Sequence, residues 1–341
     1  MSGQKIHTME QFAAASGISR PTVSKYFNDP DSVRPRTREK IEEALGRFNY
    51  TPNLFAINQN RKKTKNIGVI VPYLADPFFA EMARMIERRC IDAGYWPILF
   101  SSHGQRQLEN NALDTLLSLR PVGALIAPLG RVSDLEHLRK FAKEVPTVTF
   151  DSNQEIGEAF VGSDNYQSIG LIVDYLCRTG EPPCFFELPP VNPNARKRTK
   201  AYIQAMEALG HTPQVIRAGD QSWDFEQTGL NEGKRLIAER KLPTNTVLCS
   251  NDRIAIGLLA AAYQMGLRVG AGTECALRVA GHDDHPWAQY TCPPLTTVRQ
   301  DYVAIVDRSI EKLFEIIASE SSDDSREETL FDGKLMLRAS A

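Results

Sequence analysis

Cationic and hydroxyl side chains recur at helical spacing in the stretch SGISRPTVSKYFN, residues 16–28. Ser19 can cap a short helix there, because its side-chain oxygen accepts from an orphan backbone N–H. Arginine is the usual bidentate partner of guanine, and hydroxyl groups bond phosphate oxygens. One face of the expected helix would then contact DNA through Arg20, Pro21, Thr22, Ser24, Lys25 and Asn28. A solvated face on a small helical domain is the alternative interpretation, and the flanking segments decide between the two.

The flanking segments supply the packing partners that so short a helix needs. Before it, Thr8 and Gln11 have the spacing of a capping box, and Gly17 suits a tight turn between two helices. After it, Pro35 opens a third helix whose apolar residues repeat at helical spacing: Ile41, Ala44, Leu45 and Phe48. Three short helices with a tight turn between the first two predict a helix-turn-helix domain, whose second helix enters the DNA major groove.

A second group of chemically useful residues follows short apolar runs that are typical of buried strands. The runs cover residues 67–71, 97–101, 123–127, 147–150, 184–188, 214–218, 246–250 and 277–281. The polar and aromatic side chains that stand just after several of them are Tyr73, Asp76, Phe78, Phe79, Ser101, Ser102, His103, Asp151, Asn251, Asp252, His282, Asp283 and Asp284. Ligands of open parallel sheets bind beyond the carboxyl ends of the strands, so these residues are candidates for a binding site.

The chemistry of this second group suits a polyhydroxylated ligand. Carboxylates and amides bind paired hydroxyls, and an aromatic ring covers the apolar face of a sugar. Trp223 in the polar loop GDQSWDFEQ adds a stacking candidate, and Arg198 could supply charge-assisted donors. Polar residues follow strands in any protein, so the prediction rests on the set and not on single members.

Helical stretches separate most of the expected strands. They cover residues 78–94, 105–119, 132–143, 166–179, 195–209, 225–240 and 253–266. Short buried strands that alternate with helices predict parallel sheets built from βαβ units. About eight such units over some 270 residues would divide into two lobes of an α/β protein.

The stretch GHDDHP (281–286) offers metal-binding side chains in a row: His282, Asp283, Asp284 and His285. Four adjacent residues cannot all face one ion from a strand or a tight turn, and no HExxH or spaced histidine cluster accompanies them. We therefore predict no metal, no cofactor and no catalytic residue. An enzyme that uses this stretch is the less favoured alternative.

Length and composition bound the class of protein. A chain of 341 residues with 42% hydrophobic residues has room for about two to three domains and a sizeable core. No run approaches the ~18 apolar residues of a membrane span, and the start MSGQKIHTMEQ lacks the apolar segment of a secretory signal. The six cysteines form no C-x-x-C pair, which is typical of reduced thiols. We therefore expect a cytoplasmic protein without a membrane partner.

The net charge of −2 is unevenly divided along the chain. The first 66 residues contain 12 lysines and arginines but only 6 aspartates and glutamates, a net charge of +6, which leaves −8 for the remainder. A basic head on an acidic body predicts that only the head meets a polyanion such as DNA.

The sequence resembles the LacI/GalR (lactose-repressor type) family of bacterial transcription regulators along nearly its whole length. The likeness is carried by ASGISRPTVSKYFN, TREKIEEALGRFNYTPN, NDRIAIGLLAA, VAGHDD and PPLTTVRQD. It implies a helix-turn-helix head at 1–51, a hinge helix and linker at 52–66, and a two-lobed periplasmic-binding-protein-like core of parallel sheets flanked by helices at 67–341. The first lobe that it implies comprises residues 67–163 and 296–325. The second lobe comprises residues 164–295 and 326–341.

The resemblance also assigns DNA contacts to positions of this chain. They are Thr8, Ser19, Arg20, Pro21, Thr22, Ser24, Lys25, Asn28, Thr37, Asn53, Ala56 and Gln59. Since a proline cannot read a base by hydrogen bonding, base recognition would rest on Arg20 and Lys25. The hinge position where the family has a leucine wedged between base steps is Gln59 here. Gln59 could bond in the minor groove, Ile57 or Leu54 could wedge instead, or the DNA could be less bent.

Contacts with a small effector are implied at positions between the two lobes. They are Asp76, Phe78, Phe79, Asp151, Arg198, Trp223, Asn251, Asp283 and Gln300. The loop that carries Trp223 differs in length from the family pattern. As effector we expect first a sugar, an activated sugar or a polyol, and second a purine.

The combined expectation is a sequence-specific DNA-binding transcriptional regulator, more a repressor than an activator, whose operator affinity a small molecule controls. It would bind a pseudo-palindromic operator in double-stranded DNA as a homodimer. No long heptad pattern follows residue 328, which favours a dimer over a tetramer. The effector could release the operator or strengthen its binding. A transport-type solute-binding protein, the alternative class, would share the two lobes but lack the basic head.

Overall fold

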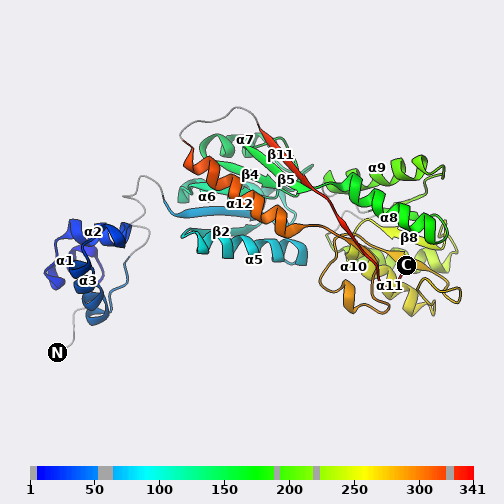
Figure 1. Ribbon diagram of the computed structural model, residues 1–341, viewed down its shortest axis with the longest axis horizontal. Helices are drawn as coiled ribbons and strands as arrows, with labels where there is room; N and C mark the ends of the chain where they lie inside the picture. The colour runs from blue at the N-terminus through cyan, green and yellow to red at the C-terminus, as the bar shows by residue number, and fades with distance from the viewer. Residues whose placement is uncertain (1–5, 53–63, 188–192, 218–222, 320–325) are drawn as a thin grey trace. The chain divides into compact units, whose positions relative to one another are not determined.

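Figure 1 shows the computed structural model of the 341-residue chain. It describes residues 6–52, 64–187, 193–217, 223–319 and 326–341. The chain forms two compact units, Met1–Lys65 and Asn66–Ala341, which we call the head and the core. Each unit has a hydrophobic interior of its own, so each is described by itself.

The described part of the head is a small bundle of short helices. They are α1 Met9–Ser16, α2 Arg20–Asn28, the 3₁₀ helix η1 Pro30–Ser32 and α3 Pro35–Phe48. Phe12, Val23 and Ile41 are fully buried at the centre of its core. Phe12 stacks on Tyr50 with ring centroids 4.8 Å apart, which ties the residues after α3 to α1. The predicted helix-turn-helix head is confirmed.

The helix ends in the head follow the predicted capping signals. The backbone N–H of Gln11 donates to Thr8 Oγ1 (3.1 Å), and the Gln11 side chain accepts from the Thr8 N–H (3.3 Å), which completes a capping box. Gly17 ends α1 at φ +68°, a left-handed conformation that glycine adopts without steric cost. Ser19 caps α2 by accepting from the Thr22 N–H at 3.4 Å. Local sequence thus sets the turn that orients α2.

The first lobe of the core is built on a six-stranded parallel sheet (Figure 1). Its strands, in spatial order, are β11 Glu327–Phe331, β5 Ala159–Ser163, β4 Thr147–Phe150, β3 Gly123–Ile126, β1 Asn66–Val71 and β2 Trp96–Ser101. The helices that cover it are α5 Pro77–Asp92, α6 Arg106–Leu119, α7 Leu135–Glu144 and α12 Tyr302–Ala318. Val69 packs with α5 and α12, whereas Ile70 packs with α6 and α7. Both faces of β1 are therefore buried, which explains its continuous apolar run.

The second lobe is built on a four-stranded parallel sheet. Its strands, in spatial order, are β7 Val215–Arg217, β6 Cys184–Glu187, β8 Thr246–Cys249 and β9 Arg278–Ala280. The remaining elements here are α8 Asn165–Thr179, α9 Pro193–Ala208, α10 Phe225–Ala238, α11 Asp252–Gln264, η2 Ala288–Tyr290 and the antiparallel pair β10 Thr297–Arg299 and β12 Lys334–Met336. Phe185 packs with α8 and α9, and Phe186 packs on the other face with α10 and α11.

Two glycines let α10 and α11 cross with their backbones in contact. A Cβ atom at Gly229 would collide with the carbonyl of Ile254, and one at Gly257 would collide with the carbonyl of Glu226. The close crossing brings Glu226, in the first turn of α10, against Arg253 at the start of α11.

In the described part of the chain, the lobes are connected by three segments, from β5 to α8, from β10 to α12 and from β11 to β12. The predicted assignment of 326–341 to the second lobe is wrong for β11, which pairs in parallel with β5 of the first lobe. Ion pairs help to hold β11 in the first lobe. The Glu327 carboxylate lies 2.7 Å from Lys312 Nζ and 2.7 Å from Arg308 Nη2 of α12. These two cations lower the pKa of Glu327 to about 2.

The eight predicted strands and seven predicted helices of the core are all present, with ends shifted by a few residues. The prediction missed β5, β10, α12, β11 and β12. All six cysteines are free thiols. Within the described ranges, no helix combines the length and the apolar character that a membrane crossing needs.

Candidate functional site

Helix α2 presents the predicted recognition residues on the side away from the core of the head. Val23 is fully buried, whereas Arg20, Pro21 and Lys25 are exposed. Helical geometry puts Ser24 on the same face as Arg20, one turn further on. A cationic, hydroxyl-bearing helix face of this kind fits the DNA major groove.

Arg20 has a partner on the neighbouring helix. Its Nε lies 2.6 Å from Oε1 of Glu10 on α1, and the two side chains are 61% and 60% exposed. An exposed pair of this kind contributes little to stability. The predicted DNA contact of Arg20 would require that the Glu10 carboxylate be displaced or that the other guanidinium nitrogens bind.

The other predicted DNA contacts in the head have hydroxyl or amide side chains. Thr8 and Ser19 accept backbone N–H bonds as helix caps, and their hydroxyl hydrogens can donate to a phosphate. Thr22, Asn28 and Thr37 are half-buried. The predicted hinge contacts that lie outside the described residues are Asn53, Ala56 and Gln59.

In the core, the nine residues predicted to contact the effector line one cavity between the lobes, with a volume of about 40 Å³. They are Asp76, Phe78, Phe79, Asp151, Arg198, Trp223, Asn251, Asp283 and Gln300. Asn194 and Phe225 complete the wall. Residues that are far apart in the sequence are thus brought together at the carboxyl ends of both sheets, as expected for open parallel sheets.

Arg198 on α9 lies at the centre of a buried polar network, and its side chain is 6% exposed. Its Nε donates to Asn165 Oδ1 at 2.9 Å, and Nη1 donates to the carbonyl of Ser250 at 2.8 Å. Nη2 donates to Asp283 Oδ1 at 2.9 Å. A guanidinium that is held on all sides keeps one orientation and presents a planar set of charge-assisted donors.

Asp283 gathers donors from several segments of the core. Its Oδ1 accepts from Arg198 and from Gln300 Nε2 (2.7 Å), and lies 3.0 Å from His282 Nδ1. Burial acts to raise its pKa, but Arg198 and then His282 outweigh burial and lower the pKa, so the group is a carboxylate. Gln300 accepts from Ser163 Oγ at 2.5 Å. The network therefore joins the segment that enters α12 to the end of β5.

Asp151, directly after β4, has a strained backbone and an unusual acidity. Its φ is +59°, in the left-handed region that non-glycine residues rarely adopt. Asn194 Nδ2 donates to both its carbonyl (2.9 Å) and its Oδ1 (3.0 Å). Burial raises the pKa of Asp151 to about 7, against the opposing effect of Arg198. A carboxyl group that titrates near neutral pH can either accept from a ligand hydroxyl or donate to one.

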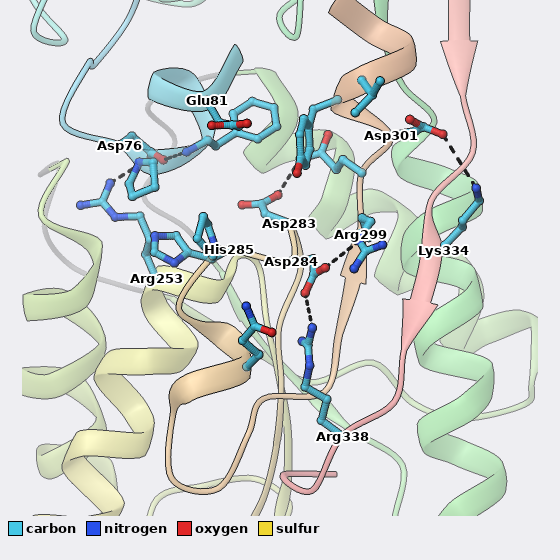
Figure 2. A pocket seen from close by; sticks show the side chains of 17 residues that line it. Asp76, Glu81, Arg253, Asp283, Asp284, His285, Arg299, Asp301, Lys334 and Arg338 are labelled. Carbon is cyan, nitrogen blue, oxygen red and sulfur yellow. Dashed lines mark hydrogen bonds and ion pairs between the residues drawn. The ribbon is translucent and has the colours of Figure 1, made fainter. Parts of the chain in front are cut away.

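Asp76 takes part in a chain of charges that spans the two lobes (Figure 2). Its Oδ1 accepts from the Phe78 N–H at 3.0 Å, and its Oδ2 accepts from Arg253 Nη1 at 3.1 Å. Arg253 also donates to both carboxylate oxygens of Glu226, at 2.7 and 2.6 Å. Asp76 belongs to the first lobe and the other two charges belong to the second, so this bridge holds the lobes together beside the cavity.

Aromatic rings from both lobes face the cavity. Trp223 stacks on Tyr73 at 5.9 Å between ring centroids, and lies 5.7 Å from Phe225. Phe78 and Phe79 pack edge to face at 5.1 Å. Such rings can cover the apolar face of a cyclic ligand while the carboxylates and amides bind its polar edge.

The four residues of the HDDH stretch lie in different environments. His282 is fully buried, and burial together with a neighbouring arginine lowers its pKa to about 4. Asp283 belongs to the cavity network, Asp284 pairs with two arginines, and burial lowers the pKa of His285. Among the residues that the structure describes, no group of three such side chains could hold a metal ion.

Four residues of this site were not predicted from the sequence. Asn194 and Phe225 begin helices that follow longer loops, so a search of the residues just after each strand did not reach them. Arg253 stands two positions after Asn251, so a search extended by one helical turn would have found it. Glu226 has no sequence signal of its own, because its position depends on the close crossing of two helices.

A helix-turn-helix head and a two-lobed α/β core that encloses a polar cavity define a DNA-binding regulator that responds to a small ligand. The model of the periplasmic binding protein-like domain matches residues 165–341, and the model of bacterial regulatory proteins of the lacI family matches residues 8–53. The chain belongs to the lacI family of bacterial transcription regulators.

Relatives match the chain over nearly its whole length. The ribose operon repressor of Escherichia coli (strain K12) is 28% identical over 321 residues, which are 94% of this chain and 96% of that protein. The HTH-type transcriptional repressor PurR of Vibrio cholerae serotype O1 (strain M66-2) is 28% identical over 334 residues, 95% of this chain and 94% of that protein. A lac repressor dimer bound to operator and the anti-inducer ONPF superposes with a TM-score of 0.84 at 25% identity, covering 98% of this chain and 99% of that one.

The protein is therefore a DNA-binding transcriptional repressor with an effector-binding core, and not an enzyme. Proteins of this family bind operator DNA as dimers and take a small effector. The basic head and the family assignment decide against a transport-type binding protein.

Proposed function

We propose that the effector is a sugar or a polyol, activated sugars included, and that it binds in the cavity around Arg198, Asp151 and Asp283. The observation that carries this proposal is the buried network of carboxylates, guanidinium and amides, with aromatic rings from both lobes beside it. Paired hydroxyls need such acceptors and donors, and a sugar ring needs an apolar cover. One relative is named a ribose operon repressor, which supports the same class of ligand.

A purine is the second candidate for the effector. Phe78 and Trp223 could cover the two faces of a flat base, and Asp151 could pair with its polar edge. The carboxylate-rich wall favours a ligand with many hydroxyl donors over a base with few.

In the head, Arg20 and Lys25 read bases in the major groove, and the hydroxyl groups around them bind phosphates. Residues 1–51 form the DNA-binding domain, and Asn53, Ala56 and Gln59 of the hinge at 52–66 contact the minor groove. The operator is pseudo-palindromic because a two-fold dimer places two recognition helices on two half-sites. The protein acts in the cytoplasm, where that DNA lies.

The homodimer forms through exposed apolar residues on both lobes. Trp96 is 59% exposed on β2, an edge strand, and Leu99 on the same strand is also exposed. In the second lobe, Tyr263 and Tyr290 are 82% and 76% exposed. Contact with a second copy would remove the apolar surface of these side chains from water.

The effector acts by parting the lobes. A volume of about 40 Å³ holds little more than one water molecule, so a sugar ring can enter only if the bridge between Asp76 and Arg253 opens. Gln300 lines the cavity, and Asp301 beside it caps α12 by accepting from the Ala304 N–H at 3.1 Å. A change at the cavity therefore moves α12 and the first lobe, and the dimer passes the change to the head, which releases the operator.

A thermal-shift screen of the full chain tests the class of effector. Sugars or polyols that bind should raise the melting temperature, the tighter ligands by more at equal concentration, and nucleobases should not. Arg198→Gln should abolish the shift, whereas Arg178→Gln, which changes an exposed arginine of α8, should leave it unchanged. Stabilisation by nucleobases alone would replace the sugar with the purine.

A further inference from the structure

The buried charges around the effector cavity do not balance. Among the described residues that line it, one is a cation and three are carboxylates: Arg198, Asp76, Asp151 and Asp283. Asp283 pairs with Arg198 at 2.9 Å, and Asp76 pairs with Arg253 at 3.1 Å (Figure 2). Arg253 also pairs with Glu226, so its single charge is shared by two carboxylates. Neither guanidinium therefore has positive charge left over for the third carboxylate of the wall.

That third carboxylate is Asp151, which is 9% exposed and forms no ion pair with a described residue. In the described part of the chain, only Asn194 donates to its side chain, and that bond reaches Oδ1, so Oδ2 is left for a ligand. Burial raises the pKa of Asp151, and Arg198 and Lys197 only partly oppose burial. Lys197 lies elsewhere, with its Nζ 5.9 Å from the centroid of the Phe160 ring. A buried carboxylate in this state is stabilised by any cation that a ligand brings.

The aromatic part of the wall also favours a cation. Phe78, Trp223 and Phe225 line the same cavity as Asp151. The face of an aromatic ring attracts a positive charge, and a tryptophan ring does so most strongly. Phe225 already has this role, because the Arg253 guanidinium carbon lies 4.8 Å from its ring centroid. A cation on the ligand would therefore interact favourably with the rings as well as with the carboxylate.

We infer that the effector carries a protonated amino group beside its hydroxyls, as an amino sugar or an amino polyol does, and that this ammonium binds to the Asp151 carboxylate. This inference rests on the proposed sugar effector. An ammonium has three donors and a full charge, so its bond to a carboxylate is stronger than that of a hydroxyl. Asp151 thus selects the amino ligand, whereas Arg198 and Asp283 bind its hydroxyls.

Calorimetric titration of the full chain at pH 7, where most of a primary amine is protonated, tests the inference. The probes are glucosamine, galactosamine and mannosamine, the N-acetyl form of each, the parent hexoses, and sorbitol with its 1-amino-1-deoxy counterpart. At least one amino compound should bind about ten-fold or more tightly than its hydroxyl parent, because charge strengthens the bond to the carboxylate. An amino sugar should also bind more tightly than its N-acetyl form, which keeps an N–H donor but has no charge.

Asp151→Asn tests the residue that the inference assigns. Asparagine has nearly the same shape and adopts the left-handed backbone of this position more readily than most residues, so the variant should fold. It should lose the preference for the amino compound over its hydroxyl parent. The matched control is Asp174→Asn, which changes a carboxylate that pairs with Arg178 on α8 and does not line the effector cavity. The control should keep the full preference.

The outcomes separate this inference from the proposal beneath it. Equal affinities for the amino compounds and their hydroxyl parents overturn the inference but leave the sugar effector standing. A preference that the N-acetyl form shares shows that charge is not what is recognised, and a preference that Asp151→Asn retains shows that another residue provides it. Either result overturns the inference. Binding of neither amino nor neutral saccharides and polyols overturns both.

Discussion

The head and the core carry their functional residues in opposite physical settings. In the head, Arg20 and Lys25 stand exposed on a short helix of a basic segment. In the core, Arg198 and Asp283 are buried in an acidic segment and bound to several partners each. The head offers exposed surface charge to a polyanion, whereas the core keeps its polar groups buried and hydrogen-bonded until a ligand replaces some of the bonds.

This contrast predicts how far function and stability can be separated. An exposed side chain can change DNA affinity with little effect on folding, because water solvates what is left behind. A buried charge cannot be removed without leaving its partner unpaired in the interior. Substitutions of the exposed cations of the head should therefore affect binding alone, and substitutions of the buried charges of the core should affect binding and folding together.

The largest expected effect is that of Arg198→Ala in the core. Its loss leaves the buried Asp283 carboxylate without its main cation, and the free energy of unfolding should fall by about 3–5 kcal/mol. Denaturant unfolding of the full chain measures the change. Arg178→Ala is the control, because that arginine is 77% exposed and pairs with Asp174 on the same helix. The control should change stability by less than about 0.5 kcal/mol, and an equal effect of both substitutions would contradict the contrast.

Arg20→Ala in the head should weaken operator binding by about 1–3 kcal/mol and relax the sequence preference, with folding unchanged. Fluorescence anisotropy on operator and on random DNA measures both affinities. Arg47→Ala removes the same charge from the last turn of α3 and should not alter the preference. If Arg20→Ala weakened operator and random DNA by the same factor, Arg20 would be a phosphate contact and not a base reader.

Effector affinity should depend on pH through Asp151. Its pKa of about 7 means that most of this group is protonated at pH 6 and ionised at pH 8. A ligand whose hydroxyls donate to the carboxylate should therefore bind about ten-fold more tightly at pH 8 than at pH 6. Below pH 7, binding should release up to one proton, which calorimetry in two buffers measures. The raised pKa also means that this group lowers the stability of the free protein as pH rises through about 4 to 7, because the unfolded chain ionises first.

Asp151→Asn supplies the control for this pH dependence. The variant keeps the acceptor oxygen but cannot ionise, so the proton release should disappear and the remaining affinity should become flat between pH 6 and 8. An unchanged pH profile in the variant would assign the titration to another group.

The smallest expected effect is that of Thr8→Ala in the head. It removes the hydrogen bond from the Gln11 N–H that caps α1, which should lower the stability of that helix by about 1 kcal/mol. Amide hydrogen exchange in α1 of the full chain should accelerate about five-fold if local opening limits it. Thr8→Ser keeps the capping hydroxyl and should exchange at the original rate. No acceleration in Thr8→Ala would mean that tertiary packing alone holds the helix.

The same contrast explains what the sequence could predict. Caps, a glycine turn and apolar spacing are local signals, so the short helices of the head were predicted with their ends. In the core, the strand-end rule found six of the nine predicted cavity residues, because parallel strands bring their carboxyl ends together. Arg198 and Trp223 were added for their chemistry, and Gln300 came only from the family resemblance. The helix α12 was missed although Asp301 and the apolar residues from Ile305 to Leu313 carry a helical signal.

Other features of the core had no local signal. The pairing of β11 with β5 depends on contacts across more than 150 residues, and the alternating exposure of β11 resembles that of any edge strand. The bridge from Asp76 through Arg253 to Glu226 depends on a helix crossing and on the closure of two lobes. Such features follow from tertiary packing, which no window of sequence contains.

The most direct test of effector-controlled DNA binding is a titration of the full chain onto DNA that flanks its own gene, with and without saccharides, at two salt concentrations. We predict binding that is far tighter than to random competitor DNA, that weakens as salt rises, and that at least one saccharide reverses. Equal affinity for every fragment, with no change on adding any saccharide or nucleobase, would contradict the account.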